Sequence, residues 1–217
     1  MSQVLVLRPE PGASATVERA RNRGLDVVAI PLFEIERVHW MAPDIHGFDG
    51  VLLTSANALR EGGEPLESLR ALPAYVVGNA TAEAARQAGF DIAATGDSGV
   101  ERLLDSIDSD LNLLHLSGEQ RHPPQHSRQK ITPVVVYRAK PMDARLPDSG
   151  VALVHSPRAG RRLAELVSER AGIAVAAISK AAAEAVGKGW KAIEAADQPN
   201  DDALLAVAER LCNNPPR

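Results

Sequence analysis

Polar residues follow several short apolar runs in this 217-residue chain, and their types suit the binding of an anion. The clearest case is the segment of residues 78–81, which follows the run Tyr-Val-Val. Gly78 lets the backbone approach a ligand closely, and Asn79 and Thr81 carry side-chain hydrogen-bond donors. A helix that starts here adds unpaired N–H groups and the positive end of its dipole. The segment therefore predicts contact with carboxylates or phosphates.

Turns of the same kind follow three other predicted strands. Thr54, Ser55 and Asn57 follow one apolar run in the first half of the chain, and Ser156 and Ser179 follow two runs in the second half. Several such turns indicate a ligand that carries several carboxylates or phosphates. The alternative for each residue is to cap the following helix, which is the more common role of Ser and Asn at such positions. The two roles are compatible, because a capped helix still offers other N–H groups.

Three arginines, Arg8, Arg138 and Arg158, lie at predicted strand ends or in extended segments. A guanidinium group can bind a carboxylate through two parallel hydrogen bonds. The alternative, and the more common case, is an ion pair with the protein's own carboxylates. We count Arg8 among the candidate ligand-binding residues.

Alternating strands and helices must hold these turns in place. Residues 75–77 predict a strand, and the alanine-rich segment that ends at Gly89 predicts a helix. Residues 4–7, 13–23 and 27–30 predict a strand, a helix and a strand, and hence two parallel strands joined by a crossover helix. Further strands are predicted over residues 51–53, 91–95, 111–116, 151–154, 173–178 and 191–194, and further helices over residues 57–61, 65–72, 100–107, 158–170, 181–187 and 201–211.

Two segments predict an extended connection. Residues 32–38 alternate between apolar and polar side chains, and residues 133–138 form a β-branched run. We expect them to pair as a two-stranded ribbon.

The second half of the chain repeats features of the first half. Ser55 and Ser156 are 101 positions apart, and so are Leu103 and Leu204. A repeat of this length predicts two copies of one α/β domain. Two such domains would have a cleft between them, lined by the turns at the strand ends, which is where α/β proteins bind ligands.

Composition excludes several classes of function. A net charge of -4 and a pI near 5.9 argue against a nucleic-acid partner, which requires a clustered basic face. Cys212 is the only cysteine, so no intrachain disulfide can form, which fits a reducing compartment. The apolar run at the N-terminus is too short for an export signal, and no segment approaches the length of a membrane span. We therefore expect a cytoplasmic protein with no membrane partner.

The sequence indicates neither a metal site nor a nucleotide site. His122 and His126 are four positions apart, but two prolines lie between them and no third ligand is near, so we predict no metal. No G-x-G-x-x-G or P-loop pattern occurs, which argues against a dinucleotide or a nucleoside triphosphate.

Six segments resemble the uroporphyrinogen-III synthase family and follow the family's order. They are VLVLRP, IPLFEIE, VLLTSANAL, YVVGNATAEAARQAGF, VVVYR and AISKAAAEA, and together they span most of the chain. The resemblance implies two α/β domains with flavodoxin-like or Rossmann-like parallel sheets, a two-stranded β ribbon that joins them and an active-site cleft between them. It implies one domain from residues 1–32 and 139–217, a second from residues 38–133, and a ribbon from residues 33–37 and 134–138.

The same resemblance implies a lyase of tetrapyrrole biosynthesis. Its substrate would be hydroxymethylbilane, a linear tetrapyrrole with acetate and propionate side chains, cyclised to uroporphyrinogen III with inversion of ring D and loss of water. It would act as a monomer, without a metal or an organic cofactor. The alternative is a non-catalytic two-domain protein that binds a polycarboxylate.

Tyr137 is the residue to which the resemblance assigns a catalytic role. It matches the tyrosine that the family places at the cleft, where a phenol could donate a hydrogen bond to the leaving hydroxyl. Packing is the alternative for a tyrosine in a strand. The turn after Ser179 departs from the family's pattern, so the role of a threonine cannot be carried over to Ala182.

Overall fold

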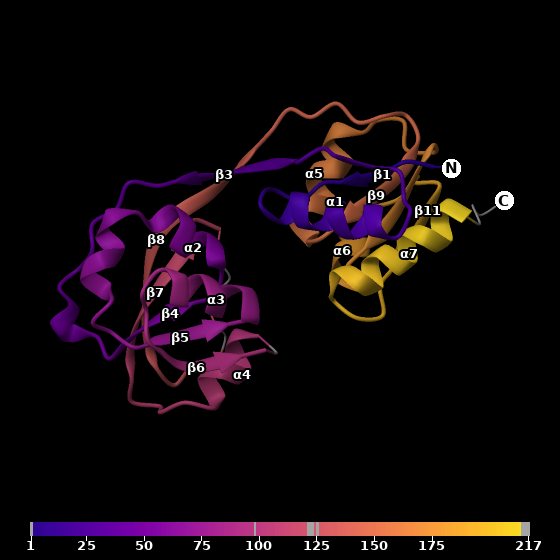
Figure 1. Cartoon of the computed structure of the whole chain (residues 1–217). Coiled ribbons are helices and arrows are strands. Elements are labelled where there is room, and N and C mark those ends of the chain that lie inside the picture. The colour runs from indigo at the N-terminus through magenta and orange to yellow at the C-terminus, as the bar shows by residue number, and fades with distance from the viewer. Residues whose placement is uncertain (1, 98, 121–123, 125, 214–217) are drawn as a thin grey trace. The chain divides into compact units, whose positions relative to one another are not determined.

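The structure, a computed structural model of the whole chain, describes residues 2–97, 99–120, 124 and 126–213. The chain divides into two compact units, and Figure 1 labels most of their elements. Unit 1 comprises Met1–Glu34 and Lys140–Arg217, and unit 2 comprises Ile35–Ala139. The chain therefore starts in unit 1, continues through unit 2 and returns to unit 1.

Unit 1 is built on a five-stranded sheet in which every pair of neighbouring strands is parallel. The order across the sheet is β11-β10-β9-β1-β2. Numbered along the chain of this unit, the strands lie in the order 2-1-3-4-5, which is that of a flavodoxin-like sheet. The three central strands are buried along their whole length, which explains their continuous apolar sequences. The strands are β1 (Val4–Val6), β2 (Val27–Ala29), β9 (Gly150–Val154), β10 (Ile173–Ala177) and β11 (Ala192–Ala195).

Helices cover both faces of this sheet. The helices α1 and α7 pack on one face, in a cluster that includes Val4 and Leu153 of the strands. The helices α5 and α6 pack against each other and against β9 and β10, and their buried residues lie outside that cluster. Gly160 permits the close approach of these two helices, because an added Cβ would lie 3.0 Å from the carbonyl oxygen of Ala182. The helix bounds are α1 (Gly12–Asn22), α5 (Pro157–Leu166), α6 (Lys180–Ala185) and α7 (Asp201–Asn213).

Unit 2 contains a six-stranded sheet with the order β3-β8-β7-β4-β5-β6. The five strands from β8 to β6 are parallel to one another. The edge strand β3 is antiparallel to β8, since Val38 donates its N–H to Val136 O while Glu36 pairs with Arg138. The strands are β3 (Phe33–Arg37), β4 (Gly50–Leu53), β5 (Ala74–Val77), β6 (Ile92–Gly96), β7 (Asn112–Gly118) and β8 (Lys130–Pro141).

The predicted pairing of the two extended segments is present, but these strands form more than a connection. β8 is 12 residues long and pairs with β7 from Lys130 onward, so both β8 and β3 belong to the sheet of unit 2. The predicted α/β class with parallel sheets is confirmed, and the antiparallel edge pair of β3 and β8 makes the sheet of unit 2 mixed. The local alternation of residues 32–38 could not reveal the difference, because a β-strand at a sheet edge and a free ribbon share the same two-residue period.

The helices of unit 2 are distributed unequally over its sheet. α2, η2 and α3 pack on one face, in a cluster with Leu53 and Leu114 of the strands. Only α4, among the described helices of this unit, packs with Leu52 and Leu113 on the other face. No described residue between β7 and β8 is helical, whereas in unit 1 the connection from β1 to β2 contains α1. The bounds are η1 (Ile45–Gly47), α2 (Ala56–Gly62), η2 (Glu64–Leu69), α3 (Asn79–Gln87) and α4 (Val100–Asp105).

The 101-residue spacing links equivalent positions of the two units. Ser55 and Ser156 are the N-cap residues of α2 and α5, and Leu103 and Leu204 are buried in α4 and α7. The remaining strands occur in a different chain order, because β1 and β2 precede the repeat in unit 1 while β7 and β8 follow it in unit 2. The two sheets thus share five strand positions, and the chain of unit 2 is a circular permutation of the chain of unit 1.

Candidate active site

A cavity of about 200 Å³ lies where the carboxyl ends of the parallel strands of unit 2 meet. The turn after β4, the end of β7, the strand β8 and the start of α4 contribute to its wall. The lining residues are Thr54, Ser55, Val100, His115, Ser117, Gly118, Gln120, Pro124 and Tyr137. The cavity therefore brings together three of the predicted site residues, Thr54, Ser55 and Tyr137.

Tyr137 is placed at the cavity by strand pairing. It lies opposite Gly118, the last residue of β7, and the backbone N–H of Glu119 donates to Tyr137 O at 2.9 Å. A Cβ added to Gly118 would lie 2.8 Å from Tyr137 Cζ and 3.0 Å from its hydroxyl oxygen. The glycine therefore leaves the space that the phenol occupies.

His115 enters the cavity from the middle of β7 and is 3% exposed. Its neighbours Leu114 and Leu116 pack in the cluster beneath α2 and α3, so the alternation of a strand turns His115 toward the opposite face. That face carries α4 alone among the described helices of unit 2. His115 Nε2 and Thr54 Oγ1 are 3.0 Å apart, within hydrogen-bond distance.

Ser55 and Asn57 act at the start of α2. Ser55 is its N-cap, and its hydroxyl oxygen accepts a hydrogen bond from Asn57 N–H at 3.3 Å. The side chain of Asn57 accepts from Arg60 at 3.2 Å. The capping role that the sequence left open for Ser55 is thus present, and the same residue also lines the cavity.

The turn after β5 has the backbone conformation that its glycine predicts. Gly78 has φ of 84°, a left-handed value that favours glycine, and it is the N-cap of α3. No atom lies within 4 Å of the place where its Cβ would be. Asn79 is exposed, whereas Thr81 is only 5% exposed and lies on the buried side of α3. The side chain of Thr81 thus packs inside unit 2, and none of these three residues is among those lining the cavity.

Ser156 and Ser179 cap helices in unit 1. Ser156 Oγ accepts from the N–H of Ala159 at 3.1 Å, and Ser179 Oγ accepts from the N–H of Ala182 at 3.3 Å. These bonds confirm the capping alternative for both serines.

The three candidate arginines have partners within the protein. Arg8 Nη1 lies 3.1 Å from Asp201 Oδ1, and Arg138 Nη2 lies 2.9 Å from Glu36 Oε2. The guanidinium of Arg158 stacks 4.1 Å from the centroid of the Phe33 ring. All three arginines at predicted strand ends or in extended segments therefore contact other side chains of the protein.

Asp201, at the start of α7, is the acceptor for several polar and charged side chains. Thr16 and Arg19 of α1 donate to it at 2.7 Å and 2.6 Å, and His155 Nε2 lies 3.1 Å from its Oδ1, in addition to Arg8. Burial alone would raise the pKa of this carboxyl, but hydrogen bonds from His155 and Thr16 and the charges of His155 and Arg8 outweigh it. The pKa of Asp201 is therefore held well below its usual range.

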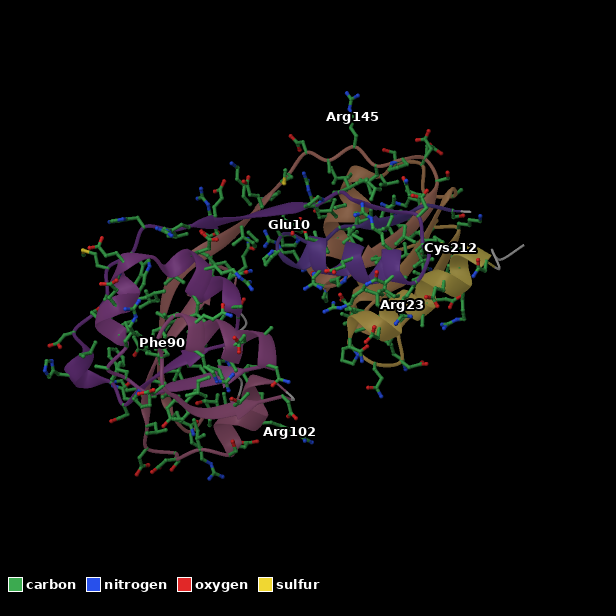
Figure 2. All side chains as sticks on the ribbon, viewed as in Figure 1. Glu10, Arg23, Phe90, Arg102, Arg145 and Cys212 are labelled. Carbon is green, nitrogen blue, oxygen red and sulfur yellow. The ribbon has the colours of Figure 1, made fainter. Side chains whose placement is uncertain are left out.

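A second set of ion pairs also links the end of α1 to α7. Arg23, labelled in Figure 2, lies just beyond the end of α1 and pairs with Asp202 and Glu209 of α7 at 2.9 Å and 3.3 Å. At the carboxyl edge of unit 1, which corresponds to the cavity of unit 2, Asp201 contacts Arg8 after β1 and His155 after β9.

Sequence reasoning missed His115, Ser117 and Gln120 as lining residues of the cavity. The available signal was the polar pair at alternate positions in the strand sequence LLHLSG, which places His115 and Ser117 on one face of an otherwise apolar strand. Both are nearly fully buried, at 3% and 2% exposure.

No group of three or more His, Cys, Asp or Glu side chains that could hold a metal ion occurs among the described residues. His122, one of the two histidines considered for a metal, lies outside the part of the chain that the structure describes. Within that part, no helix is both long and apolar enough to cross a membrane.

Fold and site together define a two-unit α/β protein with a polar cavity at the carboxyl end of one of its sheets. The family model of uroporphyrinogen-III synthase HemD matches residues 14–206. The chain therefore belongs to the uroporphyrinogen-III synthase family, whose members are lyase-type enzymes of haem biosynthesis. The predicted family is confirmed.

Solved structures agree with this fold. The uroporphyrinogen-III synthetase of Helicobacter pylori is similar with a TM-score of 0.71 and 16% identity, over 97% of this chain and 100% of that chain. A mutant uroporphyrinogen III synthase of Thermus thermophilus has a TM-score of 0.59 and 17% identity, over 99% of this chain and 100% of that chain. The comparison with curated proteins gives no match.

Proposed function

We propose that this chain cyclises hydroxymethylbilane to uroporphyrinogen III and that the cavity of unit 2 holds the reacting end of the substrate. One observation carries the proposal: Tyr137, Thr54 and Ser55 line one cavity at the carboxyl edge of a parallel sheet, in a chain of the uroporphyrinogen-III synthase family. Ligands of α/β sheets bind at this edge.

The reaction consists of the loss of the terminal hydroxyl and a rearrangement at ring D. The terminal hydroxyl of the bilane leaves as water, which gives an azafulvene. The substituted carbon of ring D attacks it, and the resulting spiro intermediate fragments and recloses with ring D inverted. Substrate and product differ by one molecule of water, so the reaction requires no oxidant or reductant.

Tyr137 is the candidate for assisting the departure of the hydroxyl. A phenol that donates a hydrogen bond to this oxygen stabilises the charge that develops as the C–O bond breaks. Gly118 leaves the ring its space, and strand pairing holds the backbone, so the donor is positioned before substrate binds. Such preorganisation reduces the cost of reaching the transition state.

The polar groups around Tyr137 are suited to the carboxylates of the substrate. Thr54 and Ser55 would contact a carboxylate in the cavity, and Asn57, Gly78 and Asn79 lie at the starts of α2 and α3, at the same sheet edge. Arg8, Ser156 and Ser179 already serve internal contacts, and the side chain of Thr81 is buried, so for these four residues a structural role comes first.

Catalysis in this proposal rests chiefly on holding a folded conformation of the bilane. Without an enzyme the bilane closes with ring D uninverted, so the protein must favour a different ring closure. Positioning can lower a barrier by roughly 7 to 11 kcal/mol in favourable cases. This explains how a site with a single phenol and several neutral donors could suffice.

The proposal also includes the compartment, the oligomeric state and the cofactor requirement of the chain. It would work in the cytoplasm as a monomer, without a metal, an organic cofactor or a nucleic-acid partner. The single cysteine fits a reducing compartment, and the net charge of -4 disfavours binding to nucleic acid. Light scattering coupled to size-exclusion chromatography measures the oligomeric state.

One assay tests the activity. The protein is supplied with freshly generated hydroxymethylbilane, and the oxidised products are separated by chromatography. We expect the type III isomer, with heat-denatured protein yielding type I. Type I alone from the folded protein would contradict the activity and would leave the alternative, a non-catalytic protein that binds a polycarboxylate, which family membership does not favour.

A further inference from the structure

The buried histidine of the cavity is chemically conspicuous. His115 is 3% exposed, and the leucines around it in β7, Leu113, Leu114 and Leu116, belong to the hydrophobic clusters of unit 2. Burying a polar ring costs free energy unless its nitrogens find partners. Its Nε2 finds one in Thr54 Oγ1 at 3.0 Å, a residue 61 positions earlier in the chain. This contact joins the end of β4 to the middle of β7 within the wall of the cavity.

A threonine hydroxyl has one hydrogen to donate, and its oxygen can accept hydrogen bonds. If His115 Nε2 carries no hydrogen, Thr54 must donate to it, and the lone pairs of Oγ1 then face the cavity. If Nε2 carries a hydrogen, Thr54 accepts, and its own hydrogen is free to point into the cavity. The ring of His115 thus decides whether the cavity meets a donor or an acceptor at Thr54.

We propose that His115 is a positioning residue that, with its hydrogen on Nε2, makes Thr54 a hydrogen-bond donor to a carboxylate of the substrate. This rests on the proposed function for the identity of the ligand, because an ionised carboxylate only accepts hydrogen bonds and therefore requires a donor at Thr54. A ring with hydrogen on Nε2 meets the requirement without carrying a charge. His115 acts through Thr54 and touches no reacting atom.

The surroundings of the pair support this role. The remaining polar side chains of the cavity wall are the hydroxyls of Ser55, Ser117 and Tyr137 and the amide of Gln120. Ser55 uses its oxygen to accept from Asn57 N–H, and Ser117 Oγ lies 3.3 Å from Val134 O, to which it donates. The hydroxyl hydrogen of Ser117 is therefore used in the bond to Val134, whereas that of Ser55 can be donated to a ligand in the cavity. A second donor at Thr54, adjacent in the chain, would let the two hydroxyls hold one carboxylate together.

Ring nitrogen chemical shifts test the proton position without any measurement of activity. Two-dimensional ¹H–¹⁵N spectra of the histidine rings distinguish the two neutral tautomers, and the His115→Gln variant assigns the signals of His115 among the six histidines. We expect hydrogen on Nε2 in the wild type and a changed Nε2 shift in the Thr54→Val variant. Hydrogen on Nδ1 alone would overturn the proposal, even in a protein that produces the type III isomer.

Kinetics test the consequence for substrate. His115→Phe keeps a flat ring in a buried position and removes the donor, so we expect KM to rise about tenfold with a smaller change in kcat. His115→Gln retains an N–H that can reach Thr54, so it should restore most of the affinity. His39→Gln changes an exposed histidine of the same unit and should leave KM unchanged.

A double variant of His115 and Thr54 tests whether His115 positions Thr54 or only packs in the core. If His115 acts through Thr54, then His115→Phe with Thr54→Val should bind substrate no worse than Thr54→Val alone. Independent, multiplying effects on KM would overturn the proposal, as would an unchanged KM in a folded His115→Phe variant. If His115→Phe does not fold, then His115→Gln and Thr54→Val still carry the test. Failure of the wild type to form type III would instead count against the proposed function.

Discussion

Tyr137 and Gly118 form a pair in which the size of one residue sets the position of the other. The added Cβ distances of 2.8 and 3.0 Å at Gly118 are shorter than van der Waals contact, so no larger residue fits without moving the phenol. The other tyrosine of the chain has a similar arrangement, since a Cβ added to Gly50 would lie 2.5 Å from Tyr75 Cε2. Tyr75, however, faces the start of β4, away from the carboxyl edge of the sheet.

This contrast supplies a matched test of the role of the phenol. We expect Tyr137→Phe to lower kcat by about tenfold to a thousandfold, because it removes one hydrogen-bond donor at the leaving hydroxyl. Tyr75→Phe removes the same atom from the same unit and should keep wild-type turnover. Steady-state assays with both variants, alongside thermal unfolding, measure the effect. Equal turnover of Tyr137→Phe and wild type would assign the departure of the hydroxyl to another group.

At the scale of the element, Asp201 makes most of the side-chain contacts between the start of α7 and the rest of unit 1. Asp201 binds groups from the end of β1, from α1 and from the end of β9, and its side chain is 11% exposed. The next residue, Asp202, is 78% exposed and pairs only with Arg23 among the described residues. Adjacent aspartates at the start of one helix therefore differ in burial and in the number of their partners.

We expect Asp201→Asn to lower the free energy of unfolding by about 2 kcal/mol at pH 7, because it leaves the buried side chains of Thr16 and His155 without a charged partner. Asp202→Asn should change it by less than about 0.5 kcal/mol, as exposed ion pairs contribute little. Urea unfolding of both variants measures these values.

The contribution of Asp201 should also depend on pH with a definite sign. Its folded-state pKa lies below the unfolded value of about 3.9, so its stabilising effect is complete above that value and is lost as the pH falls toward the folded-state pKa. The difference in stability between wild type and Asp201→Asn should therefore shrink as the pH falls from about 4 to about 2. A constant difference over this range would mean that the charge of Asp201 is not the stabilising feature.

At the scale of the whole molecule, each unit has its own core. One cluster, which includes Leu153, lies within unit 1, and the clusters that contain Leu114 and Leu52 lie within unit 2. The two tryptophans are divided in the same way. Trp40 donates to Gly62 O in unit 2, and Trp190 donates to Val186 O in unit 1. We propose that the two units are domains that unfold separately.

The repeat offers a matched pair of variants for this proposal. Leu52 and Leu153 are 101 positions apart, and both are fully buried. Replacing either by Ala should cost about 2 to 5 kcal/mol. With Trp190 as the only tryptophan, in a Trp40→Phe background, Leu153→Ala should shift the fluorescence transition and Leu52→Ala should leave it in place. Equal shifts would show that the units unfold as one.

Most predicted strands and helices agree with the observed elements because they depend on neighbours in sequence. The turn at Gly78 shows this: a β-branched run, a glycine and an alanine-rich segment encode strand, left-handed turn and helix within fifteen positions. The helix predicted over residues 65–72 is instead the 3₁₀ helix η2, and the one predicted over residues 158–170 ends at Leu166. The repeat and the family segments are equally readable from the chain alone.

By itself, then, the sequence determined the strand-turn-helix units, the internal repeat and the family. Only the tertiary structure decided which turns share a cavity, that Arg8 is paired with Asp201, and that His115 meets Thr54. The physical reason is that these contacts join residues far apart in the chain, and strand order creates them. The local sequence does not indicate that β7 lies beside β4, so the contact of His115 with Thr54 could not be predicted without the strand order.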